Sequence, residues 1–138
     1  MGIGKHLIDR INTNSLYQTI GIQLKSAGKG EARSILKPAA TVCWPFENQP
    51  HGGILFTLMD TTMAWAIQSE LASGFSCTTI DLDIRYILPA RGEAFTCRAR
   101  TIHRTNRLCF VSAAVTDPEE RTIASGQATF RIIKMDFI

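Results

Sequence analysis

One segment of the 138-residue chain, residues 51–67, is apolar on nearly every side of a helix. It begins with His51-Gly52-Gly53, continues to about Leu71, and carries eight large apolar side chains: Ile54, Leu55, Phe56, Leu58, Met59, Met63, Trp65 and Ile67. A helix without a polar stripe is one that protein surrounds. Because the segment is short for a membrane span and has Asp60 in its middle, we expect the central helix of a globular domain and no membrane partner.

Asp60 is the one ionisable side chain between His51 and Glu70. Burial of the apolar side chains contributes roughly 12–24 kcal/mol in gross terms, enough to bury a carboxylate whose desolvation costs several kcal/mol. Asp60 is therefore either a hydrogen-bonded structural acid or a functional one. The two glycines favour function, because they leave backbone N–H groups uncovered at the positive end of a helix, where an oxyanion or a carbonyl oxygen binds.

The glycine turn and Asp60 are too far apart to act on one atom within one chain. Nine residues separate His51 from Asp60, which is roughly 13–14 Å along a helix axis. A reacting carbonyl needs its oxyanion donors and its base each at about 3 Å. We therefore expect a homodimer, in which the turn of one subunit faces the aspartate of the other.

Size and composition predict one domain over residues 1–138. The net charge of +3 suits a phosphorylated ligand but is too small to predict a nucleic-acid partner. The apolar run near the N-terminus is too short for a signal peptide. The four cysteines form no Cys-x-x-Cys pair, which predicts no metal site and no disulfides but free thiols in a reducing cytoplasm: Cys43, Cys77, Cys97 and Cys109.

The rest of the chain is predicted to be mostly strands. We expect a short helix over residues 5–12, strands over 17–24 and 31–36, a short extended piece over 41–44, a loop over 45–50, and strands over 78–88, 94–103, 108–116 and 122–133. Long strands joined by short turns predict an antiparallel meander. One long helix before such strands predicts an α+β domain whose sheet curls around the helix.

Several motifs in this order are similar to the hotdog-fold acyl-CoA thioesterases, and most to their PaaI-like branch of the phenylacetate-pathway type. His51-Gly52-Gly53 is followed after six residues by Asp60, and then by a strand that ends in Tyr86-Ile87-Leu88-Pro89-Ala90. Residues 104–108 and 124–130 fit as well, so that the resemblance covers roughly residues 17–133.

The resemblance implies a hotdog fold, with a sheet wrapped around one long helix and dimers whose two sheets join. Two such dimers usually form a tetramer. The implied reaction is hydrolysis of a fatty or aromatic acyl-CoA to the free acid and CoA, with no cofactor other than the CoA of the substrate. The acyl group stays open, and we expect a tunnel lined by Leu55, Phe56, Met59 and Met63.

The resemblance also implies roles for particular residues. Asp60 is the catalytic carboxylate, as a general base or as a nucleophile. Gly52 donates its N–H to the thioester oxygen, with Gly53 beside it. His51 orients the turn or the carbonyl, or is simply bonded to the backbone. Thr79 places the attacking water.

Two details depart from this pattern. Strict alternation along the strand over 78–88 puts Thr79 on the outer face with Asp81 and Asp83, and leaves Thr78 as the substitute. Relatives often carry an asparagine six residues before the histidine, where this chain has Pro45. In the same loop, Asn48 and Gln49 are the expected substitutes.

The CoA phosphates call for arginines and backbone N–H groups near turns. The expected contacts are Arg85, Arg91, Arg104, Asn106 and Arg107. Three alternatives remain: a hotdog protein that binds acyl-CoA without hydrolysing it, a hotdog dehydratase or hydratase, and a structural domain with a buried Asp60. Retention of Asp60 argues against the first, the distance from His51 to Asp60 against the second, and the His-Gly-Gly turn against the third.

Overall fold

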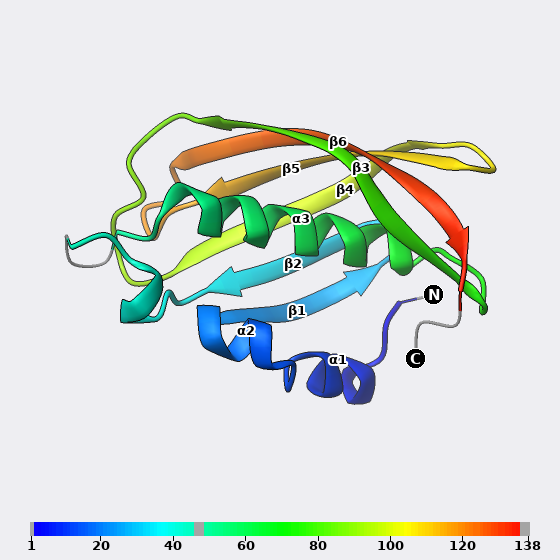
Figure 1. Cartoon of the computed structure of the whole chain (residues 1–138), viewed down its shortest axis with the longest axis horizontal. Helices are drawn as coiled ribbons and strands as arrows, with labels where there is room; N and C mark the ends of the chain where they lie inside the picture. Colours follow the sequence, from blue (N-terminus) through cyan, green and yellow to red (C-terminus); the bar gives the residue numbers. More distant parts are fainter. Residues whose placement is uncertain (1, 46–48, 136–138) are drawn as a thin grey trace.

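The chain folds into one antiparallel sheet that curls around one long helix (Figure 1). This computed structural model describes residues 2–45 and 49–135. Three α-helices, one 3-10 helix and six strands follow one another in these residues: α1 Lys5–Ile11, α2 Ser15–Ile20, β1 Ile22–Gly28, β2 Glu31–Leu36, η1 Ala40–Val42, α3 Gly52–Gln68, β3 Phe75–Tyr86, β4 Phe95–Arg104, β5 Leu108–Thr116 and β6 Thr122–Lys134. The expected α+β architecture is confirmed.

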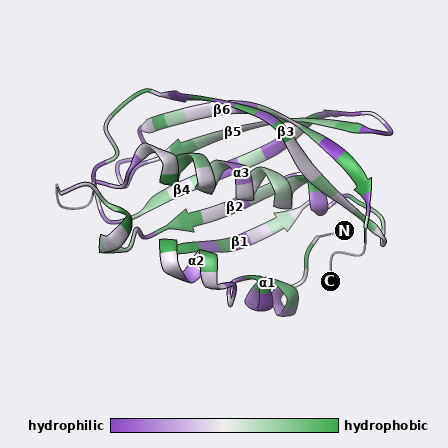
Figure 2. Ribbon diagram, in the orientation of Figure 1, coloured by the Kyte–Doolittle hydropathy of each residue, from purple (hydrophilic) through white to green (hydrophobic). Residues whose placement is uncertain are grey.

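The core lies between α3 and the concave face of the sheet. Alternate residues of each strand point to this face; Cys97 and Ala99 of β4, and Val111 and Val115 of β5, are at most 4% exposed. On the helix, Leu58 and Met63 are fully buried. Hydrophobic and hydrophilic residues mix along most strands in Figure 2, as expected for a sheet with one face buried.

The strand order is β1-β2-β4-β5-β6-β3, and all pairs are antiparallel. Strands β4, β5 and β6 form the expected meander. The predicted neighbour relation between β3 and β4 is wrong, because β3 pairs with β6 at the far edge and β4 enters beside β2. The segment around Pro89 is therefore a crossover between distant strands, which places β3 at an open edge of the sheet.

Two short N-terminal predictions need correction. The strand expected over 17–24 begins only at Ile22, as β1, and residues 15–20 form the helix α2. The Asn14 side chain accepts a hydrogen bond from the Leu16 N–H at 2.8 Å, and Gly21 ends the helix with a φ of +101°. Residues 40–42 form the 3-10 helix η1 instead of an extended piece. The helix over 5–12 is confirmed as α1.

A β-bulge interrupts β3. Thr79 pairs with Phe130 and Asp81 pairs with Thr129, so Ile80 has no partner of its own across the β3–β6 ladder. A bulge of one residue reverses which face the following side chains occupy. Odd-numbered residues before Ile80 and even-numbered residues after it therefore face the same helix, α3.

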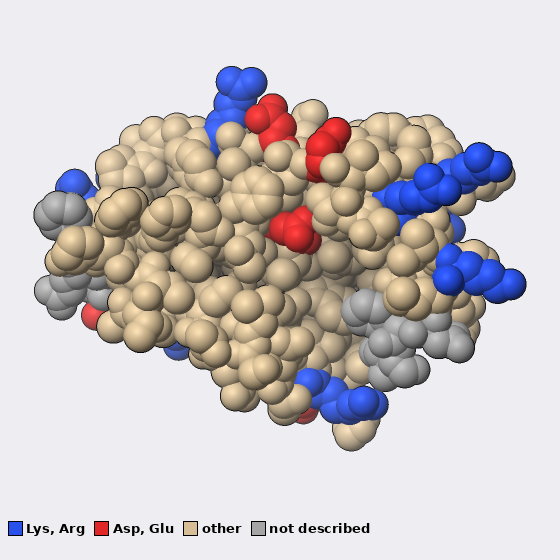
Figure 3. Space-filling view, viewed as in Figure 1, with Lys and Arg blue, Asp and Glu red and all other residues tan. Residues whose placement is uncertain are grey.

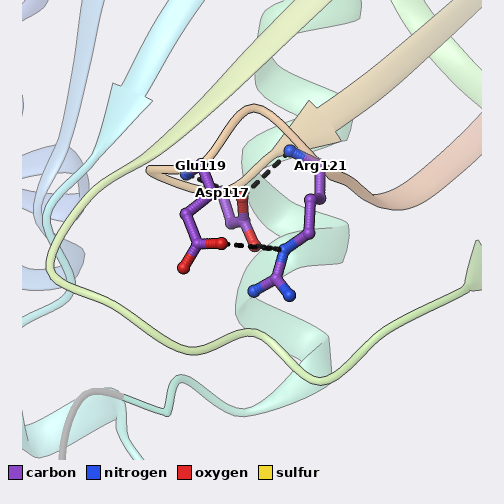
Figure 4. A network of polar contacts seen from close by, with 3 residues as sticks. All are labelled: Asp117, Glu119 and Arg121. Carbon is purple, nitrogen blue, oxygen red and sulfur yellow. Dashed lines mark hydrogen bonds and ion pairs between the residues drawn. The ribbon is translucent and has the colours of Figure 1, made fainter.

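The turn between β5 and β6 is held by a polar network (Figure 4). Asp117 accepts hydrogen bonds from the backbone N–H groups of Glu119 and Arg121 at 2.9 and 3.0 Å, and from Nε of Arg121 at 2.8 Å. Burial alone would raise the pKa of the Asp117 carboxyl, but these hydrogen bonds and the charge of Arg121 outweigh it and lower that pKa. The network lies at the end of the molecule where α3 begins (Figure 1).

Candidate functional site

The first turn of α3 presents one open backbone N–H, not two. His51 caps the helix, and its Nδ1 accepts a hydrogen bond from the Gly53 N–H at 2.8 Å. The expectation that Gly53 offers a free donor beside Gly52 is therefore wrong. In the described residues the Gly52 N–H has no such partner. Because Nδ1 is the acceptor, the proton of a neutral His51 ring is on Nε2.

Two aromatic rings fix this turn. Trp44 stacks on His51, with ring centroids 5.1 Å apart and an angle of 28° between the planes. The hydroxyl of Tyr86 donates to the Gly52 carbonyl at 2.9 Å, and a Cβ at position 52 would lie 3.2 Å from two Tyr86 ring carbons. Position 52 therefore suits glycine. Tyr86 positions the turn, a role that the sequence did not indicate, because Tyr86 stood out there only as a residue near the end of a strand.

Asp60 is half-buried on α3 and is held by β3. The Thr79 hydroxyl donates to Oδ1 of Asp60 at 2.7 Å. The interpretation that Thr79 lies on the outer face, with Thr78 as its substitute, is wrong, because the bulge at Ile80 shifts the alternation. Cys77 and Thr79 contact α3 before the bulge, and Tyr86 contacts it after the bulge.

The groups around Asp60 are neutral and inert. Burial raises the pKa of the Cys77 thiol to about 12, with smaller contributions from Cys109 and Asp60. Burial also raises the pKa of Tyr17, whose hydroxyl accepts a hydrogen bond from Nε1 of Trp65 at 2.7 Å. A thiol that stays protonated at neutral pH is a poor nucleophile. Asp60 therefore remains the chemically competent group in this region.

One stripe of α3 is left uncovered by this chain. Its members recur at helical spacing and are exposed or half-buried: Gly53, Phe56, Thr57, Asp60, Thr61, Ala64 and Gln68. The expectation that protein surrounds the helix on all sides does not hold for a single chain. Leu55, Met59 and Met63 are at most 2% exposed, so they are core residues and not the walls of a tunnel, whereas Phe56 is 37% exposed.

Large exposed apolar side chains also lie along β3 and just after it. Ile80, Tyr86 and Ile87 are each more than half exposed, and Leu88 is 41% exposed. They belong to β3 and the residues after it, and β3 is the open edge of the sheet. Exposed apolar side chains along an edge strand are typical of an interaction surface.

The expected CoA contacts do not meet in one chain. Asn106 and Arg107 line an open hollow of about 500 Å³ at the β4–β5 turn, together with Arg131, which the sequence did not single out. Arg104 also lies at this end, where its Nη1 donates to the Glu70 carbonyl at 3.3 Å, just after α3. Arg91 lies at the opposite end, near the β5–β6 turn, and Arg85 is 3.9 Å from Asp83 in an exposed ion pair.

Acidic side chains lie from the middle of the face that carries α3 to its upper margin in Figure 3, where a basic side chain stands beside them, and further lysines and arginines project at the end of the β4–β5 turn. Asn48, the expected substitute for the missing asparagine, lies outside the described residues. Among the residues that are described, no three metal-ligating side chains form a cluster.

Comparisons with known proteins agree with this geometry. The sequence pattern of the Thioesterase superfamily matches residues 50–124, which include the helix start, Asp60 and Thr79. The chain belongs to this superfamily. A relative from Halobacterium salinarum, named as a presumptive esterase, is 30% identical over 135 residues, covering 91% of this chain and 89% of its own.

Solved structures of similar proteins share the fold of this thioesterase-family chain. A conserved protein from Pseudomonas aeruginosa is 31% identical, with a TM-score of 0.80, over 87% of this chain and 94% of its own. A thioesterase from Haemophilus influenzae has a TM-score of 0.88 at 19% identity, over 96% and 92%. The PaaI protein from the phenylacetic acid degradation operon of E. coli has a TM-score of 0.81 at 20% identity, over 93% and 91%. The predicted PaaI-like hotdog fold is confirmed.

Membership of this superfamily indicates that the protein is a hydrolase. None of the helices in residues 2–45 and 49–135 combines the length and the apolar character needed to cross a membrane.

Proposed function

We propose that this protein is an acyl-CoA thioesterase that acts as a homodimer, with each active site built from two chains. The observation that carries the proposal is the arrangement on the uncovered stripe of α3. The stripe starts beside the open Gly52 N–H and, after two turns, contains Asp60, oriented by Thr79. Eight residues of helix separate the two groups by about 12 Å, too far for both to reach one carbonyl.

A second copy resolves this distance. If its α3 lies against the first, the Gly52 turn of one chain faces the Asp60 of the other, and the two uncovered stripes cover each other. The exposed apolar residues beside β3 become buried in the same step, and the open edges can pair into one continuous sheet. We expect two such dimers to associate further, as the family resemblance implies.

Within such a site the reaction is the addition of water across the carbon–sulfur bond of the thioester. The Gly52 N–H stabilises the oxyanion at the positive end of the helix. Asp60 either takes a proton from the attacking water or attacks the carbonyl itself to form a mixed anhydride that water then cleaves. Thr79 holds one oxygen of Asp60, so the other faces the substrate. Loss of the CoA thiolate, which takes up a proton, leaves the free acid.

The activity is tested by thiol release from acetyl-, hexanoyl-, palmitoyl-, phenylacetyl- and benzoyl-CoA. We expect turnover of at least one thioester and a loss of about 10²–10⁴-fold in Asp60→Asn, the usual effect of removing a positioned base. Glu120→Gln, an exposed carboxylate in the β5–β6 turn, is the matched control. Tight binding of an acyl-CoA without any turnover would instead identify a non-catalytic binder.

The two-chain site is tested by mixing inactive variants. Asp60→Asn removes the carboxylate, and Gly52→Ala crowds the turn against the Tyr86 ring. After the subunits are exchanged, half of the dimers contain one chain of each kind, and one of their two sites is intact, so about a quarter of wild-type activity returns. Failure to recover activity after confirmed exchange would place the whole site within one chain.

A further inference from the structure

Three arginines meet on the face of the sheet that is turned away from α3. Arg33 of β2 and Arg98 of β4 are direct cross-strand partners, and Arg100 lies two residues further along β4. Their sequence neighbours Ala32, Ser34, Cys97 and Ala99 are buried under α3. Because side chains alternate along a strand, the three arginines point to the opposite face.

This like-charge arrangement has no compensating ion pair within the described residues. None of the three guanidinium groups pairs with a carboxylate there. Glu31 is the cross-strand partner of Arg100 but forms no ion pair with it, and Asp9 is engaged by Lys5 at 3.2 Å. Like charges that face each other directly across two strands destabilise a sheet. Binding of an anion would reduce the repulsion between these arginines.

The arginines line a hollow large enough for a small molecule. Its volume of about 1050 Å³ is at the upper end of the range for ligand pockets. One wall is formed by α1, with Ile8, and by Ile3 just before this helix. Its floor consists of small residues such as Gly28 and Ala114, with the hydroxyls of Ser26 and Ser112 in the same rows of the sheet. Among its lining residues, cations outnumber carboxylates: Lys5, Lys25, Arg33, Arg98 and Arg100 against Asp9 and Glu31. We name it the basic hollow.

We infer that the basic hollow binds a phosphate-bearing small molecule at a site separate from the candidate active site. A planar guanidinium presents paired N–H donors that match two phosphate oxygens, and three of them together suit a pyrophosphate or a polyphosphate chain. A nucleic acid fits less well, because Asp9 and Glu31 flank the hollow and the chain carries a net charge of only +3. The inference does not depend on the proposed thioesterase activity.

The test is calorimetric titration of the full chain at low salt with inorganic pyrophosphate, ATP and CoA. We expect binding that weakens as salt is added, and a loss of about tenfold or more for each of Arg33→Gln and Arg98→Gln, since hydrogen bonds to charged groups are the strong ones. Arg10→Gln, on the same helix α1 but outside the hollow, is the matched control. Arg107→Gln, which removes an arginine of the hollow at the β4–β5 turn, shows whether the probes bind at that hollow instead.

The probes distinguish the sources of the phosphate. Binding of pyrophosphate and ATP that is lost in Arg33→Gln supports a general phosphate site, and binding of CoA alone, lost in the same variant, supports a site for the nucleotide end of CoA. Binding that is unchanged in Arg33→Gln and Arg98→Gln overturns the inference. A change in subunit association in these variants, without any binding of the three probes, would assign the arginines to a contact between copies of this chain and would also overturn it.

Discussion

Thr79 controls which part of the Asp60 carboxylate is available for chemistry. Its hydroxyl occupies Oδ1 at 2.7 Å, so Oδ2 is the oxygen left to face the uncovered side of α3. The same bond limits rotation of the carboxylate. A positioned carboxylate reacts faster than a rotating one, because the cost of orienting it has been met during folding.

We predict that Thr79→Val lowers kcat by about 10–100-fold, the usual effect of losing a hydrogen bond to a charged group, and leaves KM nearly unchanged. The measurement is steady-state hydrolysis of whichever acyl-CoA the wild type turns over. Thr78→Val, which changes the neighbouring hydroxyl, is the control and should retain activity. Equal losses in both variants would show that β3 acts as a whole, not through the Thr79 hydroxyl.

For individual residues, the sequence indicated which side chains are candidates for function but not which atoms they contact. Asp60 stands out because no other ionisable residue is near it, and the glycines stand out because of their position before an apolar helix. The capture of the Gly53 N–H by His51 depends on a ring orientation set by Trp44, seven residues before His51, and no local pattern encodes it. The roles of His51, Asn48 and the arginines remain predictions.

Among the elements, β3 depends most on a single inserted residue. The bulge at Ile80 lets Cys77 and Thr79 face α3 on one side of it, and Leu82, Ile84 and Tyr86 on the other. Sequence alternation has a fixed period of two, so it predicts the strand but fails at a bulge, where the period is broken. Alternation also failed at α2. It predicted a strand there, whereas the capping residues Asn14 and Gly21 favour the helix that is observed.

Deletion of Ile80 should therefore be far more harmful than its substitution. We predict that the deletion turns one half of β3 away from α3 and lowers the free energy of unfolding by several kcal/mol, as for the loss of several buried contacts. Ile80→Thr keeps the residue count at an exposed position and should cost about 1 kcal/mol or less. Urea unfolding, followed by circular dichroism, measures both. Similar stability of the two variants would mean that β3 tolerates a regular register.

The β5–β6 turn gives a prediction about pH. The pKa of Asp117 is lowered in the folded chain from its ordinary value of 3.8, so its contribution to stability is fully present above that value and is lost as the pH falls through the folded pKa. We predict that Asp117→Asn unfolds at a lower temperature than the wild type at pH 7, and that the difference shrinks below about pH 4. Thermal unfolding across pH measures this. Glu119→Gln, whose ion pair to Arg121 is longer at 3.8 Å, should show a small and nearly constant difference.

For the whole molecule, the fold class was predictable because it follows from one apolar helix and a run of strands, and the family was predictable from the resemblance of the His-Gly-Gly turn, Asp60 and the strand that ends before Pro89-Ala90. The strand order was not, since nothing in the sequence around Pro89 distinguishes a hairpin from a crossover. The subunit arrangement follows from a distance argument, about 12 Å along the helix, and it remains a prediction.

We predict that Phe56→Glu weakens the dimer and abolishes thioester hydrolysis together, because a charge on the uncovered stripe of α3 would be buried against the partner. The measurements are sedimentation velocity and thiol release on the same samples. Leu16→Glu, at a 52% exposed position on α2, is the control and should change neither. An active, monomeric Phe56→Glu variant would contradict the two-chain site.

The position of β3 at the edge of the sheet also orders events during synthesis. Its one partner in the described sheet is β6, the last of the six strands along the chain, and Phe75 pairs with Lys134. While the ribosome is still translating the last strand, β3 has no ladder to join, and Thr79 has no fixed place beside Asp60. The contact between Thr79 and Asp60 and the proposed dimer edge are thus completed only after β6 has been made, later than the pairing of β1, β2, β4 and β5.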